Sequence, residues 1–187
     1  MDAFRVLIIT AFTSSLFFLS GPVSANEPPP FRLQVDISDN KLNVYSGQDV
    51  LMTYDISVGK DKHPTPTGDF TIRKIIWNPG WVPPPEKWAK GKKPKQPGDP
   101  DNPMKVVKMF FVEPDYYIHG TGDTDALGQP ASHGCVRMDP QEARELAQQV
   151  MEHGGRPQPD PWYRRIFRSR KTTVVHLSQP VAMAVVE

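Results

Sequence analysis

The segment FRLQVDISDNKLNVYSGQDVLMTYDISVG, residues 31–59, decides which fold class the sequence predicts. Apolar and polar residues alternate along 31–38, and Leu33, Val35 and Ile37 share one face, as in a half-buried β-strand. The rest of the segment is typical of two further strands joined by a short turn at 46–49. Because a short turn joins antiparallel neighbours, the chain is expected to open with an antiparallel sheet.

Further strands are predicted along most of the remaining chain. Residues 63–77 combine proline-fixed turns with a strand, and 104–112 and 116–120 are short apolar runs rich in β-branched and aromatic residues. Two more strand-like segments, 172–178 and 181–186, lie near the C-terminus. Strands are therefore expected to dominate the fold.

One α-helix is predicted to follow Asp139, which is a suitable N-cap residue. Pro140 fits the first helical position, and Glu142 completes a capping-box pattern. The apolar stripe of this helix consists of Ala143, Leu146, Ala147, Val150 and Met151, and two glycines then end it. The predicted fold class is mainly β with one prominent α-helix.

Two segments do not fit the pattern of strands. Residues 79–103 contain eight prolines and lack apolar periodicity, so we expect a long irregular loop. Trp77, Trp81 and Trp88 lie in or beside it, which favours a lid or the wall of a substrate groove over a solvated excursion without a role. The basic run 164–171 is expected to be a solvated face, with attraction to an anionic envelope polymer as the alternative.

Residues 1–25 have the features of a cleavable signal peptide. Arg5 precedes an apolar run of signal-peptide length, and small residues end at Ala25. We expect cleavage after Ala25 and export to the periplasm or cell envelope; an uncleaved anchor is the alternative. The remaining chain, 26–187, has the length of a single domain, is expected to be a monomer, and carries too little net charge (+1 for the whole chain) to indicate a nucleic-acid partner.

Cys135 is the only cysteine of the chain and lies in the segment SHGCVRM, 132–138. In an exported protein an unpaired cysteine suggests an intermolecular partner or a reactive thiol. A thiol attacks carbonyl groups as the thiolate, which requires a base or a cation beside it. His119 ends a predicted strand, and the loop after it is long enough to return to Cys135, so His119 is preferred to His133 as the base.

The residues around Cys135 suggest further roles. Gly134 permits a sharp turn, so the amides of Gly134 and Cys135 are predicted to form an oxyanion site. Arg137 offers a planar, two-pronged partner for a carboxylate. Two alternatives remain: a small buried cysteine without chemistry, or a metal site on His119, His133 and Cys135, whose spacing matches no common zinc pattern.

The sequence resembles the L,D-transpeptidases of the YkuD type. The resemblance lies in IHGTG (118–122) followed by ASHGCVRM (131–138), and it extends to ISVGKDKHPTPTGDF (56–70), WNPGWVPPP (77–85) and PDNP (100–103). It covers roughly residues 31–154 and leaves 155–187 as a C-terminal extension without an assigned role. This combination of motifs is far more specific than any one of them.

The resemblance implies a β-sandwich catalytic domain that acts on the peptide stems of bacterial peptidoglycan and needs no metal or organic cofactor. It implies Cys135 as the nucleophile and His119 as the general base, with the carbonyl of Gly120 orienting the imidazole. Ser132, His133 and Gly134 would shape the pocket and the oxyanion site. The candidate substrate-binding residues are Arg137, Trp81 and His63.

The resemblance also implies a reaction. Cys135 would attack the third residue of a tetrapeptide donor stem, release the terminal D-alanine, and pass the acyl group to a stem amine in a 3→3 cross-link. With water, a free D-amino acid or an amine of an envelope protein as acceptor, the same chemistry would give carboxypeptidase, exchange, cross-link-cleaving or protein-anchoring activity. A non-catalytic peptidoglycan-binding module is the alternative from a different functional class.

Overall fold

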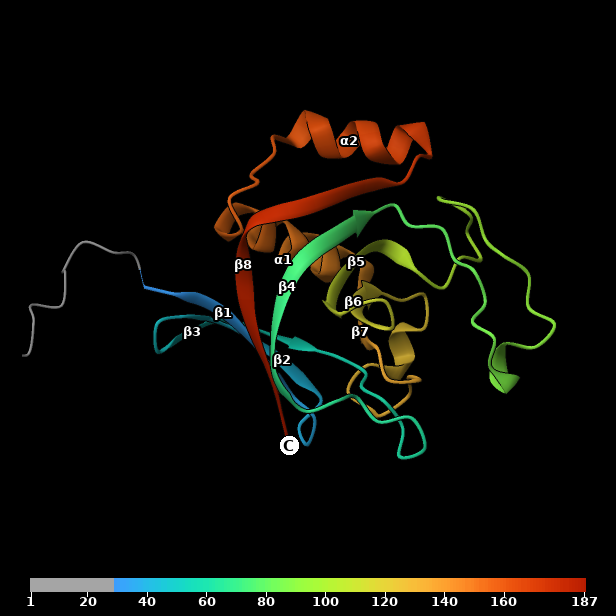
Figure 1. Cartoon of the computed structure of the whole chain (residues 1–187), viewed down its shortest axis with the longest axis horizontal. Coiled ribbons are helices and arrows are strands. Elements are labelled where there is room, and N and C mark those ends of the chain that lie inside the picture. The colour runs from blue at the N-terminus through green and yellow to red at the C-terminus, as the bar shows by residue number, and fades with distance from the viewer. Residues whose placement is uncertain (1–28) are drawn as a thin grey trace, which may run out of the picture.

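A computed structural model of the protein describes residues 29–187 (Figure 1). The strands are β1 (Phe31–Asp36), β2 (Lys41–Ser46), β3 (Asp49–Asp55), β4 (Gly68–Trp77), β5 (Lys105–Val112), β6 (Tyr116–Gly120), β7 (Val136–Met138) and β8 (Thr173–Val186). The helices are α1 (Pro140–His153), α2 (Asp160–Ser169) and the short 3-10 helices η1 (Lys87–Ala89) and η2 (Thr124–Ala126). The prediction of a mainly β fold with one prominent helix is confirmed.

The predicted signal peptide, 1–25, lies outside the described residues. None of the helices within 29–187 is both long enough and apolar enough to span a membrane. The cleavage site after Ala25 and the export that it implies therefore stay predictions.

The strands form one hydrogen-bonded sheet in the order β3-β2-β1-β8-β4-β5-β6-β7. As predicted, β1, β2 and β3 pair antiparallel. The long strands β4 and β8 belong to both halves of the sheet. Residues 68–72 of β4 pair with the part of β8 that also pairs with β1. Residues 74–77 of β4 pair with β5 as well as with β8. The register between β4 and β8 shifts between Ile72 and Lys74, and both strands curve strongly in Figure 1. A single bent sheet thus provides the two layers of the fold.

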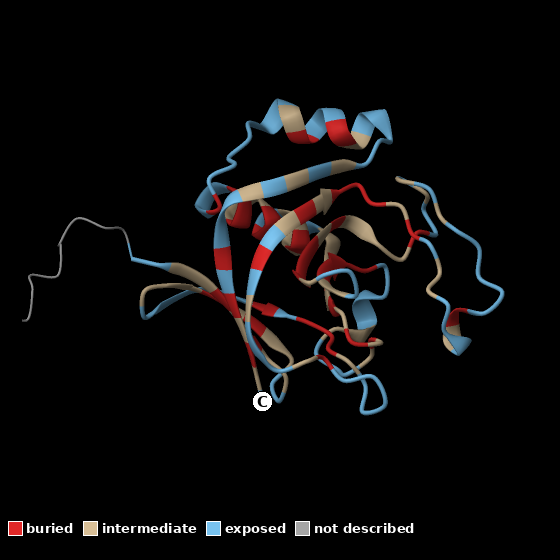
Figure 2. Cartoon of the chain, viewed as in Figure 1, coloured by how far each residue is buried: buried red, intermediate tan, exposed pale blue. Residues whose placement is uncertain are grey.

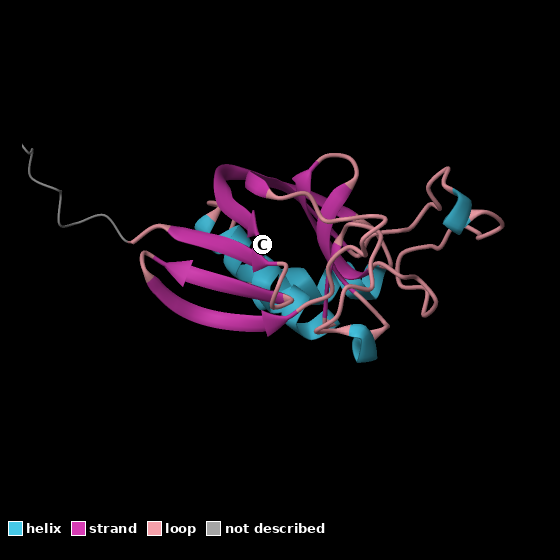
Figure 3. Cartoon of the chain, turned by 90° about the horizontal axis from the view of Figure 1, so that it is seen from below, coloured by secondary structure: helices cyan, strands magenta, loops and turns pink. Residues whose placement is uncertain are grey.

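Helix α1 lies between the two halves of the sheet (Figure 3). It packs against β5, β6 and β8, and its C-terminal residue His153 stacks on Phe31 of β1, with ring centroids 4.0 Å apart. The predicted apolar stripe of α1 is fully buried, which places it within the core that Figure 2 shows in red. The side chain of Asp139 caps the helix by accepting hydrogen bonds from the amides of Gln141 (2.8 Å) and Glu142 (3.3 Å), as predicted.

Four features of the fold differ from the sequence prediction. Most of the basic run belongs to a second helix, α2, whose Trp162, Tyr163 and Phe167 pack on Trp77. Trp77 is therefore a core residue and does not belong to the groove of the loop. Strand β7 has three residues and was not predicted, and the two C-terminal strands are the single strand β8.

We expect replacement of Asp139 by alanine to lower the free energy of unfolding by about 1 kcal/mol, because two amides of the first turn of α1 lose their acceptor. Asp139→Asn retains an acceptor oxygen and should lose much less. Urea denaturation of both variants measures the difference. Equal losses for the two variants would show that the carboxylate charge, and not the cap hydrogen bonds, stabilises this end of the helix.

Candidate active site

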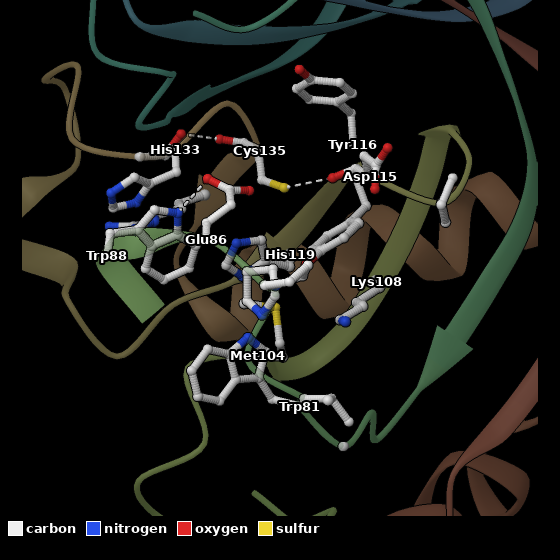
Figure 4. A pocket seen from close by; sticks show the side chains of 18 residues that line it. Trp81, Glu86, Trp88, Met104, Lys108, Asp115, Tyr116, His119, His133 and Cys135 are labelled. Carbon is white, nitrogen blue, oxygen red and sulfur yellow. Dashed lines mark hydrogen bonds between the residues drawn. The ribbon is translucent and has the colours of Figure 1, made fainter. Parts of the chain in front are cut away.

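The pairing of β6 with β7 brings the two principal candidate residues together. The strands run parallel, with Ile118 opposite Val136 and His119 opposite Arg137. Cys135 immediately precedes β7, so it reaches the end of the sheet next to Tyr117 and His119. As the sequence predicts, the loop after β6 returns to this place. Cys135 and His119 line the same cavity of about 630 Å³, and Figure 4 shows both side chains facing it.

The imidazole of His119 is held in one orientation and one tautomer. Its Nδ1 lies 2.8 Å from the carbonyl oxygen of Gly120, and because a carbonyl only accepts, Nδ1 carries the proton and donates. Nε2 is therefore left as an acceptor. Burial lowers the pKa of His119 from 6.5 to about 3, and the cations Arg137 and Lys108 act in the same direction. The ring is neutral at neutral pH and able to receive a proton at Nε2.

The thiol of Cys135 is also neutral at rest. Burial raises its pKa, against the opposing effects of hydrogen bonds from the backbone and side chain of Tyr117 and of the cations Lys108 and Arg137. The thiol donates a weak hydrogen bond to the carbonyl of Asp115, at 3.4 Å (Figure 4). The site thus holds a protonated thiol beside an unprotonated imidazole.

The segment 132–135 is tied by its own hydrogen bonds. The hydroxyl of Ser132 donates to the carbonyl of Cys135 (2.6 Å) and accepts from the amide of Gly134 (2.9 Å). The predicted oxyanion pair is therefore corrected, because the amide of Gly134 already has an acceptor. The amide of Cys135 has no acceptor among residues 29–187 and remains free to face a substrate.

Gly134 is required where it stands for two reasons. Its φ is +106°, and a Cβ placed there would lie 2.7 Å from Cε1 of Tyr116.

The carbonyl of Gly134 accepts a hydrogen bond from the buried hydroxyl of Thr65 (3.0 Å), which in turn accepts one from the amide of Gly59 (2.8 Å). Thr65 was not among the site residues predicted from the sequence. Its position between two prolines, in a segment that resembles the YkuD family, could have indicated it.

The proline-rich loop forms one wall of the cavity. Trp81, which is buried, and Trp88 both line it, which agrees with the groove-wall interpretation. Trp88 stacks on His133, with ring centroids 4.1 Å apart and planes within 15°. The ring of His63 also contacts that of His133, with ring centroids 5.0 Å apart, but His63 does not line the cavity. A role of His63 in substrate binding therefore stays a prediction.

Cations and tyrosines complete the cavity. Arg137 lines it, with Nη1 3.9 Å from Oδ2 of the exposed Asp123. Lys108, on β5, lies over the ring of Tyr117 at 4.4 Å and forms no ion pair within the described part of the chain. Lys108 and Tyr117 were not among the site residues predicted from the sequence. The signal for Lys108 was a charged residue inside the apolar run 105–112.

The metal alternative is not supported by the geometry. Among residues 29–187 no three His, Cys, Asp or Glu side chains are placed to hold a metal ion. Nδ1 of His119 is occupied by the Gly120 carbonyl, and the ring of His133 stacks on Trp88 and contacts His63 at a tilt. The three proposed ligands therefore serve separate contacts.

The Gly134→Ala variant should lose about 2–5 kcal/mol of unfolding free energy, the sum of a strained positive φ and overlap with Tyr116. Gly91→Ala is the matched control: its φ is +81°, but nothing lies within 4 Å of the added methyl group, so it should lose only about 1–2 kcal/mol. Urea denaturation measures both. A Gly134 variant no less stable than the Gly91 variant would show that Tyr116 simply moves aside.

The free energy of unfolding should fall as the pH is lowered from 6.5 toward 3, because the unfolded chain binds a proton on His119 that the folded chain excludes. One such proton contributes up to about 1.4 kcal/mol per pH unit to the slope of the unfolding free energy against pH. In His119→Asn, which retains a donor for the Gly120 carbonyl, this contribution disappears. Chemical denaturation at a series of pH values tests this, with exposed His176→Asn as control. Unchanged slopes for His119→Asn would mean that the imidazole is not buried as a neutral group.

Comparisons with known proteins agree with this geometry. A family profile described as the L,D-transpeptidase catalytic domain, YkuD, matches residues 30–176. The putative L,D-transpeptidase YkuD of Bacillus licheniformis is 29% identical over 118 residues, which are 63% of this chain and 59% of that protein. The putative L,D-transpeptidase YqjB of Bacillus subtilis is 28% identical over 148 residues, 74% of this chain and 79% of that protein.

Solved structures share the fold. An L,D-transpeptidase from Mycobacterium smegmatis superposes with a TM-score of 0.53 at 19% identity, covering 84% of this chain and 58% of that one. L,D-transpeptidase 3 from Mycobacterium tuberculosis superposes with a TM-score of 0.52 at 18% identity, covering 85% and 62%. The chain thus spans about three fifths of the length of several proteins it matches.

Proposed function

Because the chain belongs to the YkuD family of L,D-transpeptidase catalytic domains, we propose that it is a cysteine-dependent acyltransferase acting on peptidoglycan peptide stems. The observation that carries this proposal is the shared cavity of Cys135 and His119, in which the free Nε2 of the imidazole is an acceptor for the thiol proton. The proposed place of action is the periplasm or cell envelope.

The first half of the proposed reaction forms an acyl-enzyme. The thiol of Cys135 gives its proton to Nε2 of His119 while the sulfur bonds to the carbonyl carbon of the third residue of a tetrapeptide stem. The free amide of Cys135 donates to the oxyanion. When the intermediate collapses, the bond to the terminal D-alanine breaks, its amine takes the proton from His119, and a thioester remains.

The second half transfers the acyl group to an amine. The acceptor amine gives a proton to Nε2 of His119 and attacks the thioester carbonyl, and the departing sulfur recovers a proton as the thiol. A side-chain amine of a second stem as acceptor gives a 3→3 cross-link. Water, a free D-amino acid or an amine of an envelope protein would follow the same steps and give the other activities of this chemistry.

The electrostatics of the site favour proton transfer only during attack. In a buried cavity a thiolate and an imidazolium would both lose hydration, and Lys108 and Arg137 stabilise the first while opposing the second. The neutral pair is therefore the resting state. A bound stem whose carboxylates face these two cations would remove the opposition to the imidazolium.

Transfer to an amine is favoured over hydrolysis by the presence of two cavities. A second cavity of about 730 Å³ meets the first along a shared wall that contains His119 and Arg137. Cys135 lines only the first cavity, so we assign the donor stem there and the acceptor to the second. A carboxypeptidase that hydrolyses single stems needs no second substrate cavity.

The proposal predicts that the full chain, incubated with tetrapeptide-rich muropeptides, produces cross-linked dimers and free D-alanine. Cys135→Ala should lose activity by a factor of about 10³ or more, and His119→Asn by about 10²–10⁴, since they remove the nucleophile and the base. Mass spectrometry distinguishes the acceptors. Tripeptide monomers without dimers would indicate hydrolysis, and unchanged muropeptides with retained binding would reject the enzyme in favour of a binding module.

A further inference from the structure

A recess distinct from the two cavities of the candidate active site lies between α2 and the start of β8. It has a volume of about 540 Å³ and is lined by Trp162, Arg165, Ile166, Arg168, Ser169, Lys171, Thr172 and Thr173. None of these residues lines the cavities around Cys135. Figure 1 shows α2 along the outside of the sheet, away from β6 and β7. The recess belongs to the C-terminal part of the chain, which the proposed reaction does not use.

Positive charge dominates this region. Residues 164–171 contain five cationic side chains, and Asp160, the first residue of α2, is the only Asp or Glu from 160 to 186. The recess is lined by three of the cations, Arg165, Arg168 and Lys171, and none of the three forms an ion pair within residues 29–187. Exposed helices usually mix both signs of charge, so an unbalanced cluster beside a recess favours an anionic ligand.

The local backbone makes the recess concave. Arg170 ends α2 with a φ of +51°, which turns the chain so that Lys171 and Thr173 run back past the last turn of the helix. The hydroxyls of Ser169 and Thr172 already donate to the carbonyls of Ile166 (2.9 Å) and Asn78 (3.1 Å). The charged donors left for a ligand are two guanidinium groups and one ammonium group, and the hydroxyl of Thr173 and the indole N–H of Trp162 also line the recess. A guanidinium group can donate two parallel hydrogen bonds to two oxygens of one phosphate.

One wall of the recess is apolar. Trp162 is half-buried against Trp77, with ring centroids 6.3 Å apart, and still lines the recess. A flat indole surface suits the face of a sugar ring, whereas phosphate alone has no use for it. The exposed residues of α2 are Asp160, Pro161, Arg164, Arg165, Arg168 and Ser169, which offer no large apolar side chain for insertion into a membrane. A polymer with sugars and phosphates fits better than a lipid surface.

We propose that this recess binds a phosphate-bearing glycan. The cations would bind the phosphate groups and Trp162 the sugar ring beside them. The inference goes beyond the proposed acyl transfer and does not depend on it, because it uses no residue of the Cys135 site. Binding to a polymer of the envelope would raise the local concentration of the domain near its peptide stems without changing the chemistry.

The experiment compares binding of the full chain to an immobilised phosphate-bearing mannan and to the same mannan after enzymatic removal of phosphate. The recess variant is Arg165→Gln/Arg168→Gln/Lys171→Gln. The matched control is Lys62→Gln/Arg73→Gln/Arg164→Gln, which removes the same charge from exposed residues that do not line the recess. We expect the recess variant to bind at least tenfold more weakly and the control to stay within twofold. Circular dichroism verifies that both variants are folded.

Three results would overturn the proposal. Equal losses in the two triple variants would mean that only net charge matters. Equal binding to the dephosphorylated mannan would mean that phosphate is not recognised. Binding to phosphatidylglycerol vesicles but not to the mannan would assign the basic face to a membrane instead.

Failure of this proposal can be told apart from failure of the proposed function. The recess variant should retain wild-type turnover of soluble muropeptides, because these reach the Cys135 site without the polymer. Cys135→Ala should lose turnover and keep wild-type affinity for the mannan. A recess variant that lost turnover together with binding would contradict the separation of the two sites.

Discussion

The parallel pairing of β6 with β7 is the constraint on which the site depends. It sets Arg137 opposite His119 and thereby brings Cys135, one residue before β7, to the buried imidazole. The other edge of β7 is fixed as well, because Arg137 and Ser57 exchange two backbone hydrogen bonds of 2.9 Å. Asp139 then starts α1 directly after the strand. A three-residue strand can position the proposed nucleophile because the segments on both of its sides are fixed.

Burial by the sheet explains the chemistry of the pair. His119 is 3% exposed, so its charged form is strongly disfavoured and its single polar partner, the Gly120 carbonyl, determines the tautomer. The same burial keeps the Cys135 thiol protonated. A pair that is neutral at rest limits side reactions of the sulfur with water-borne oxidants, since the thiolate is the reactive form. In the proposed reaction, the bound substrate therefore has to induce the proton transfer from Cys135 to His119.

The sequence was informative where structure is local. The alternation in 31–59, the cap at Asp139 and the apolar stripe of α1 depend on neighbouring residues, and all three appear in the structure. Tertiary contacts were not accessible: Trp77 is buried by residues of α2 that are more than 80 positions away. The basic side chains of α2 hid its apolar face, and no pattern showed that the Gly134 amide would be taken by Ser132.

The proline-rich loop shows how an irregular segment can form a fixed wall. Prolines remove amide donors, so few backbone hydrogen bonds are available to hold it. Two are formed between Trp81 and Lys95, each of 2.8 Å, and the buried side chain of Asn102 donates to the carbonyl of Pro79 (2.8 Å) and so joins the two ends of the loop. With the two ends of the loop joined in this way, the stacking of Trp88 on His133 holds the outer part of the loop against the cavity. The position of this wall is therefore coupled to the segment that carries Cys135, because His133 contacts the loop and lies two residues before Cys135.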